Sequence, residues 1–157
     1  MTIQEYIKKY LKWAGLDESE SKFIFSDKFG DSPKLADELL DLILAGEKTA
    51  ACSSLWEHEH DGQMVPYVGM RSVILNGSDE PKCIIETTEV TIRKFSEVDE
   101  YFAASEGEGD KSLKYWREAH KRFFSRTLPK IGREFSIDMP LVCERFKVIY
   151  KVAIPAE

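Results

Sequence analysis

Lys48 is the residue whose surroundings in the sequence point most directly to chemistry. It follows Gly46, which ends an apolar helical stretch at 42–45, and it precedes small and hydroxyl-bearing residues at 49–54. A glycine at this place supplies the left-handed backbone that closes a helix, so we expect Lys48 at a fixed corner beside the negative end of that helix. There it can bind a phosphate, polarise a carbonyl or, if burial lowers its pKa, act as a general base. The alternative is that Lys48 only complements the helix dipole, which is worth about 0.3–1 kcal/mol.

Two helices are predicted before this corner. Thr2 and Glu5 have the spacing of a capping box, and apolar residues recur at helical spacing over 3–14. Ser32 followed by Pro33 predicts the start of a second helix. The buried stripe of that second helix should consist of Ala36, Leu39, Leu40 and Ile43.

Strand-like segments follow the corner. Residues 72–75 and 82–92 are rich in β-branched side chains and predict two strands joined by a hairpin loop, and 141–152 predicts a final strand. A short aromatic run at 23–25 predicts one more strand or an anchor. The polar segment between Glu57 and Met70 predicts a loop or loose hairpin.

Two further helices are predicted between these strands, a short one from Ser96 to before Gly107 and one over 111–125. On the second helix, one apolar sector adjoins a basic stripe formed by Lys114, Arg117 and Lys121. The sector consists of Leu113, Trp116, Ala119, His120, Phe123 and Phe124. Strands and helices without regular βαβ alternation indicate an α+β fold. The most economical arrangement is a small β-barrel or curled sheet, mixed and mostly antiparallel, with covering helices.

Composition limits the classes of protein. The chain has 157 residues, of which 43% are hydrophobic, and this predicts one soluble domain over 1–157. No apolar run of about 18 residues is present to span a bilayer, and the first residues lack the features of a signal peptide, so we expect a cytoplasmic location. The cysteines Cys52, Cys83 and Cys143 are far apart and match neither a disulfide framework nor a zinc spacing. We therefore expect buried thiols and neither a metal nor another cofactor.

The charges are segregated along the chain. The net charge of −6 argues against coating of nucleic acid by bulk electrostatics. Residues 17–47 are rich in Asp and Glu, whereas 111–133 contains a cluster of basic side chains. A polyanion would therefore meet the second segment.

The order of these motifs resembles the ASCH domain family, relatives of the PUA-like RNA-binding barrels. The resemblance rests on Gly46-Glu47-Lys48-Thr49, on the hairpin at 72–92, and on residues 104–110 followed by the Trp-containing helix. It covers 26–151, with the barrel and helices over 26–152. Residues 1–22 look like the N-terminal helical extension of the larger bacterial members.

The resemblance implies a cleft that accepts RNA or a modified nucleoside. Some family members are ribonucleases that act on single-stranded RNA, and a smaller branch hydrolyses acylated cytidine with a lysine, a threonine three residues later and a later glutamate. In this sequence the lysine falls on Lys48 and the glutamate on Glu106, with Glu108 as the competing choice, whereas the threonine position holds Ala51. That departure argues against amide hydrolysis, although Thr49 and Ser53 share the strand parity of Ala51 and either can be proposed as a substitute.

Further side chains are candidates for binding a ligand. Glu86 lies where its strand turns polar, although an ordinary sheet surface with cross-strand pairs is the alternative. Single-stranded RNA is commonly read by stacking on aromatic rings, and Trp56 and Tyr67 are flanked by polar residues. Phosphate contacts are expected from the basic helix, through Lys121, Ser125 and Arg126. The alternative is that the basic stripe is only a solvated face.

Two histidine-containing features have plainer interpretations. His58 and His60 can face the same way on a strand, as in some metal sites, but no third histidine lies nearby and a solvated loop accounts for them. His120 falls in the apolar sector of its helix, where a hydrogen-bonded core residue is the simpler interpretation than an acid or base.

Together these features predict a protein that binds RNA or a modified nucleoside in a cleft around Lys48 and Glu106 and acts in RNA metabolism or translation regulation. The alternative is a metal-independent hydrolase, either a single-stranded RNA ribonuclease or an amidohydrolase of N4-acetylcytidine. Lys48 would then be the general base and Glu106 the acid, with Thr49 as the third catalytic candidate. A sensor of a small anionic metabolite is a third class. The oligomeric state does not follow from the sequence.

Overall fold

The computed structural model describes residues 1–151. These residues form two compact units that alternate along the chain. The first unit comprises Met1–Gly46, Val68–Thr88 and the chain from Phe146 onward, and the second comprises Glu47–Tyr67 and Glu89–Arg145. The expectation of a single domain over 1–157 stays a prediction.

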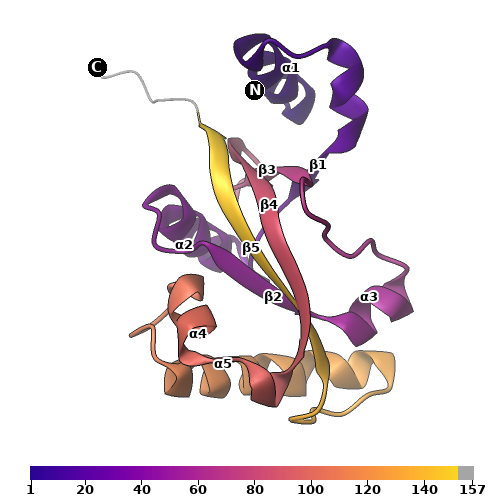
Figure 1. Cartoon of the computed structure of the whole chain (residues 1–157), viewed down its shortest axis with the longest axis vertical. Helices are drawn as coiled ribbons and strands as arrows, with labels where there is room; N and C mark the ends of the chain where they lie inside the picture. The colour runs from indigo at the N-terminus through magenta and orange to yellow at the C-terminus, as the bar shows by residue number, and fades with distance from the viewer. Residues whose placement is uncertain (152–157) are drawn as a thin grey trace. The chain divides into compact units, whose positions relative to one another are not determined.

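The strands form one mixed sheet in the order β1-β3-β4-β5-β2 (Figure 1). β1 (Ile24–Asp27) runs parallel to β3 (Arg71–Leu75), and β3 runs antiparallel to β4 (Pro81–Lys94). β2 (Ala50–Ser54) runs antiparallel to β5 (Pro140–Lys151), with Cys52 directly opposite Cys143. This confirms the α+β class and the mixed, mostly antiparallel sheet with helices. The last residue of the strand expected over 141–152, Val152, lies outside the described residues.

The first unit begins with helices that have the predicted caps. The Oγ1 of Thr2 accepts a hydrogen bond from the backbone of Glu5 at the start of α1 (Ile3–Ala14), and the Oγ of Ser32 caps α2 (Pro33–Leu44). A 3₁₀ helix, η1 (Glu18–Phe23), leads into β1. The apolar face of α1 packs in a core that consists of Tyr6, Ile7, Tyr10, Leu11, Ile24, Val73 and Ile84. The four residues predicted for the stripe of α2 are all buried.

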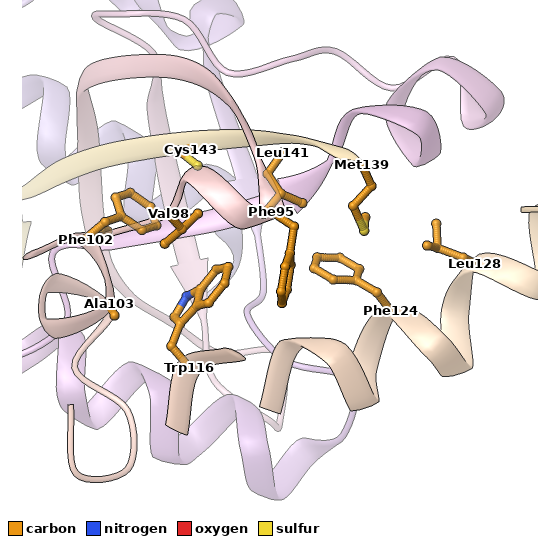
Figure 2. Close-up of a cluster of buried hydrophobic side chains, with 11 residues drawn as sticks. Phe95, Val98, Phe102, Ala103, Trp116, Phe124, Leu128, Met139, Leu141 and Cys143 are labelled. Carbon is orange, nitrogen blue, oxygen red and sulfur yellow. The ribbon is translucent and has the colours of Figure 1, made fainter. Parts of the chain in front are cut away.

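The second unit is organised around an aromatic core that Figure 2 shows in close-up. The second unit contains β2, α3 (Leu55–Asp61), η2 (Phe95–Glu97), α4 (Glu100–Glu106), α5 (Leu113–Thr127) and η3 (Leu128–Ile131). α4 and α5 contact each other. Trp116 lies with its ring 5.1 Å from that of Phe95, and Phe95 lies 4.9 Å from Phe135. This core supports the elements that position Lys48.

Two details differ from the expectation. Residues 55–61 form the helix α3 instead of a loop, because the hydroxyl of Ser54 accepts a hydrogen bond from the backbone of Glu57 and Gly62 closes the helix with a φ of 66°. Phe123 was expected in the apolar sector of α5, but its side chain is 37% exposed. The core there is filled by Trp116 and Phe124, which are buried.

Candidate functional site

Lys48 lies between the end of α2 and the start of β2, and its side chain is only 2% exposed. Gly46 has a φ of 77°, as expected for the residue that closes the preceding helix. The Nζ of Lys48 lies 3.4 Å from the Oε1 of Glu106 and 3.1 Å from the Oε2 of Glu108, and it donates to the backbone carbonyl of Glu106 at 3.4 Å. The structure thus brings both candidate carboxylates to the same ammonium.

The backbone also joins the end of α4 to the Lys48 corner. The backbone N–H of Thr49 donates to the carbonyl of Ser105 at 2.8 Å. Gly107 ends α4 with a φ of 73°, and a Cβ there would lie 2.3 Å from the carbonyl oxygen of Glu47. Glycine at 107 therefore serves two needs, the left-handed backbone and the close approach of two chain segments.

The carboxylate of Glu106 also contacts side chains of α5. The indole Nε1 of Trp116 donates to its Oε2, and the Nε2 of His120 lies 3.5 Å from the same oxygen. Burial is the largest influence and raises the pKa of this carboxyl, but the charge of Lys48 and the contacts with His120 and Trp116 outweigh it and lower the pKa to about 2. Glu106 is therefore a carboxylate at neutral pH.

Lys48 is correspondingly an ammonium. Burial alone lowers the pKa of a lysine, but the negative charges of Glu106 and Glu108 outweigh burial and the pKa of Lys48 is raised. A charged ammonium donates hydrogen bonds and attracts anions, and it accepts no proton. The pair is thus arranged for electrostatic binding.

His120 connects α5 to the same carboxylate, a contact that the sequence did not reveal. Its Nδ1 lies 2.8 Å from the carbonyl oxygen of Trp116, and its ring stacks on the indole of Trp116 at 4.2 Å and 19°. Burial is the largest influence and lowers the pKa of His120, but the contact with Glu106 and its negative charge outweigh it, so the pKa is raised. Periodicity placed His120 on the apolar sector, and no local signal marked Glu106 as its neighbour.

Cys52 completes the cluster from the strand β2. A ligand atom of Cys52, one of Glu106 and one of His120 all lie within 4.8 Å of one another. Burial, followed by the negative charge of Glu106, raises the pKa of the Cys52 thiol well above its ordinary value. The sequence predicted a buried thiol at Cys52 but did not predict that it lies near Glu106 and His120.

The hydroxyl candidates on β2 and directly before it make other contacts. The Oγ1 of Thr49 donates to the carbonyl of Ser105 at 3.5 Å, and Thr49 is exposed. The Oγ of Ser53 lies 2.7 Å from the Nε2 of His58 on α3. His60 pairs with its neighbour Asp61 at an exposed position.

The aromatic candidates differ in their surroundings. The guanidinium of Arg133 lies over the ring of Trp56 at 4.5 Å, so this face of the ring already has a partner. Tyr67 is 44% exposed. In the first unit, the Oε2 of Glu86 lies 3.6 Å from the Nζ of Lys147, a cross-strand pair of the kind expected on an ordinary sheet surface.

The basic face of α5 is exposed along its length, including Ser125. The Nζ of Lys121 lies 5.8 Å from the centre of the Phe135 ring, and the guanidinium of Arg126 lies 5.6 Å from that of Phe123. Cations beside aromatic rings suit contact with phosphates and bases.

The mixed sheet with helices is of the PUA-like kind. The chain matches the sequence model of the ASCH domain over residues 25–150, and it belongs to the ASCH domain family. The helix α1 and the 3₁₀ helix η1 precede the matched residues and form the N-terminal addition.

Two solved structures are similar over most of the chain. A crystal structure of an ASCH domain from Lactobacillus crispatus JV V101 has 43% sequence identity and a TM-score of 0.84, with 94% of this chain and 93% of that chain covered. A protein from Enterococcus faecalis V583 has 35% identity and a TM-score of 0.85, with 94% and 87% covered. No curated protein matches the chain. Within residues 1–151, no helix is long and apolar enough to cross a membrane.

Proposed function

We propose that this protein binds RNA or a modified nucleoside at the Lys48–Glu106 site and acts in RNA metabolism or translation regulation. The observation that carries the proposal is the buried ammonium of Lys48, which has one enclosed and one partly exposed carboxylate partner. The side chain of Glu106 is 3% exposed, whereas that of Glu108 is 27% exposed. Membership of the ASCH family, whose fold resembles RNA-binding domains, supports the same function.

Glu108 is suited to exchange with a ligand. It lies between Gly107 and Gly109, which both have positive φ. A phosphate or another anionic group can displace the Glu108 carboxylate from Lys48, while Glu106 keeps the ammonium in place. Binding would therefore replace the Glu108 carboxylate with an anionic group of the ligand, and no buried charge would be left unpaired.

A binding assay tests this proposal. Fluorescence anisotropy with a labelled single-stranded oligoribonucleotide, and calorimetry with cytidine monophosphate and N4-acetylcytidine, would be performed in EDTA with the full chain. Lys48→Met should weaken binding by roughly 10- to 100-fold, the value of a hydrogen bond to a charged group. Glu108→Gln should tighten the binding of anionic ligands by about two- to fivefold, because a partly exposed ion pair is worth up to about 1 kcal/mol.

Lys94→Met is the matched control, since Lys94 belongs to the same unit and its side chain is 59% exposed. This variant should bind as the unmodified protein does. Equal affinity of the Lys48 and Lys94 variants, with circular dichroism showing both folded, would contradict the proposed site.

The hydrolase alternative has less support from the charges. A general base must accept a proton and a general acid must donate one, whereas the pKa of Lys48 is raised and that of Glu106 is lowered to about 2. Incubation of the same samples with single-stranded RNA and N4-acetylcytidine tests this alternative. Turnover in EDTA that disappears in Lys48→Met would favour the hydrolase over a protein that only binds.

A further inference from the structure

We propose that Cys52, Glu106 and His120 bind a zinc ion, with a fourth position open to water or a ligand. The three residues come from β2, from the end of α4 and from α5, and one ligand atom of each lies within 4.8 Å of the other two. Thiolate, imidazole and carboxylate are the donors that zinc uses in proteins, and sites with three protein ligands keep one position open. Thiolate and imidazole together favour zinc over magnesium or calcium.

The orientation of His120 supports this proposal. Its Nδ1 lies 2.8 Å from the carbonyl oxygen of Trp116, so an N–H at Nδ1 donates to that oxygen and Nε2 faces the cluster. Zinc-binding histidines almost always donate their other ring N–H to a carbonyl or carboxylate, which fixes the ring and the tautomer. The backbone of α5 thus fixes the Nδ1 proton and the ring orientation, which leaves Nε2 to bind a metal ion in exchange for its own proton.

The separation of Nε2 from Glu106 also fits a metal ion. The distance from the Nε2 of His120 to the Oε2 of Glu106 is 3.5 Å. A hydrogen bond between an imidazolium and a carboxylate is shorter, at about 2.7–2.9 Å. Two ligands bonded to a tetrahedral zinc at about 2.0–2.1 Å lie roughly 3.3–3.4 Å from each other. The observed separation is therefore nearer to the edge of a zinc tetrahedron than to a direct hydrogen bond.

The carboxylate of Glu106 already has the supporting contacts of a metal ligand. The Nε1 of Trp116 donates to Oε2, and the Nζ of Lys48 lies 3.4 Å from Oε1. Ligating carboxylates are in turn hydrogen-bonded, and such partners tune the affinity of a metal site.

The charges of the cluster can accommodate the ion. The carboxylates of Glu106 and Glu108 and a thiolate of Cys52 together balance a divalent ion and the ammonium of Lys48. Cys52 is only partly buried and the side chain of His120 is 16% exposed, so two of the three residues border solvent. The proposal does not depend on RNA or nucleoside binding.

Metal titration of the full chain tests the proposal. The reduced protein, stripped with EDTA and freed of any affinity tag, would be titrated with Zn²⁺ by calorimetry and with Co²⁺ as a spectroscopic substitute. We expect one ion per chain, tetrahedral Co²⁺ bands in the visible and a thiolate-to-cobalt charge-transfer band in the near ultraviolet. Cys52→Ser should remove the charge-transfer band. His120→Gln should weaken zinc by more than the roughly 10- to 100-fold that loss of an outer partner costs.

Cys143→Ser is the matched control, because Cys143 lies directly opposite Cys52 on β5 but has no place in the cluster. This variant should keep the charge-transfer band. Absence of stoichiometric zinc binding by the unmodified protein would overturn the proposal without any variant. A band that is lost with Cys143→Ser and kept with Cys52→Ser would also overturn it.

Discussion

Replacing Lys48 with methionine removes the ammonium from the buried cluster and keeps most of the volume of the side chain. The side chains of Lys48 and Glu106 are 2% and 3% exposed, so solvent screens their interaction little. The variant leaves the carboxylate of Glu106 near Trp116, His120 and Cys52 but without the ammonium. Removal of one partner from a buried ion pair costs about 3–5 kcal/mol, because the other charge stays buried without compensation. We expect Lys48→Met to lower the free energy of unfolding by that amount.

A double-mutant cycle isolates the interaction. Glu106→Gln should cost a similar amount, because it removes the enclosed carboxylate that faces Lys48 and leaves the partly exposed Glu108. The double variant Lys48→Met/Glu106→Gln buries neither charge, so its loss should be smaller than the sum of the single losses by about 2–3 kcal/mol.

Urea unfolding in EDTA, monitored by tryptophan fluorescence and circular dichroism, would measure the four proteins of the cycle. Equal slopes of the transitions would show that the same unfolding reaction is compared. Additive single and double losses, within about 0.5 kcal/mol, would refute the reasoning that Lys48 and Glu106 stabilise each other.

Three further perturbations test other parts of the molecule. The folded pKa of His120 is raised above its ordinary value. Its contribution to the free energy of unfolding is therefore complete below about pH 6.5 and is lost as pH rises through the folded pKa. The metal-free protein should unfold at a higher urea concentration at pH 5.5 than at pH 8.5, and His120→Gln should reduce that difference. Gly107→Ala should lower the free energy of unfolding more than Gly46→Ala does in the same urea assay. Both glycines have positive φ, but only at 107 would a Cβ lie against backbone. Gly46→Ala should cost about 1–2 kcal/mol, and equal losses for the two variants would argue against the close approach at 107. The double variant Lys121→Glu/Arg126→Glu should weaken RNA binding and reduce the slope of log K against log salt by about 1.4, at roughly 0.7 per phosphate contact on a single strand. Fluorescence anisotropy at several salt concentrations measures this slope. An unchanged slope would exclude this face of α5 as a site of phosphate contacts.

Local signals in the sequence were sufficient for the elements with clear caps. Thr2 and Ser32 start α1 and α2 as predicted, because a capping hydroxyl acts on backbone groups only a few residues away. The same type of signal was present at Ser54, where the polar composition of residues 57–62 favoured a loop and α3 was missed. A short helix stabilised by a cap and by packing leaves little periodicity to detect.

The site could be predicted only in part. Lys48 and Glu106 are separated by 58 positions, and their pairing came from the family resemblance instead of from spacing. His120 was expected in the apolar sector of its helix and Cys52 as a buried thiol, whereas their approach to Glu106 depends on how α4, α5 and β2 pack. Periodicity specifies which face of an element is buried, and it does not specify which polar group from another element meets it.

The order of the segments along the chain has a consequence for synthesis. The last segment of the second unit ends at Arg145, and the first unit also requires residues from Phe146 onward. The boundary between these segments lies within β5, whose residues 141–145 pair with β2. Domains of many proteins fold in sequence as the ribosome releases them, but here neither unit is complete until the final strand has emerged. Near Lys48, β2 therefore acquires its partner only after residues 141–145 have emerged, and a ribosome that stalls before β5 would leave both units unfinished.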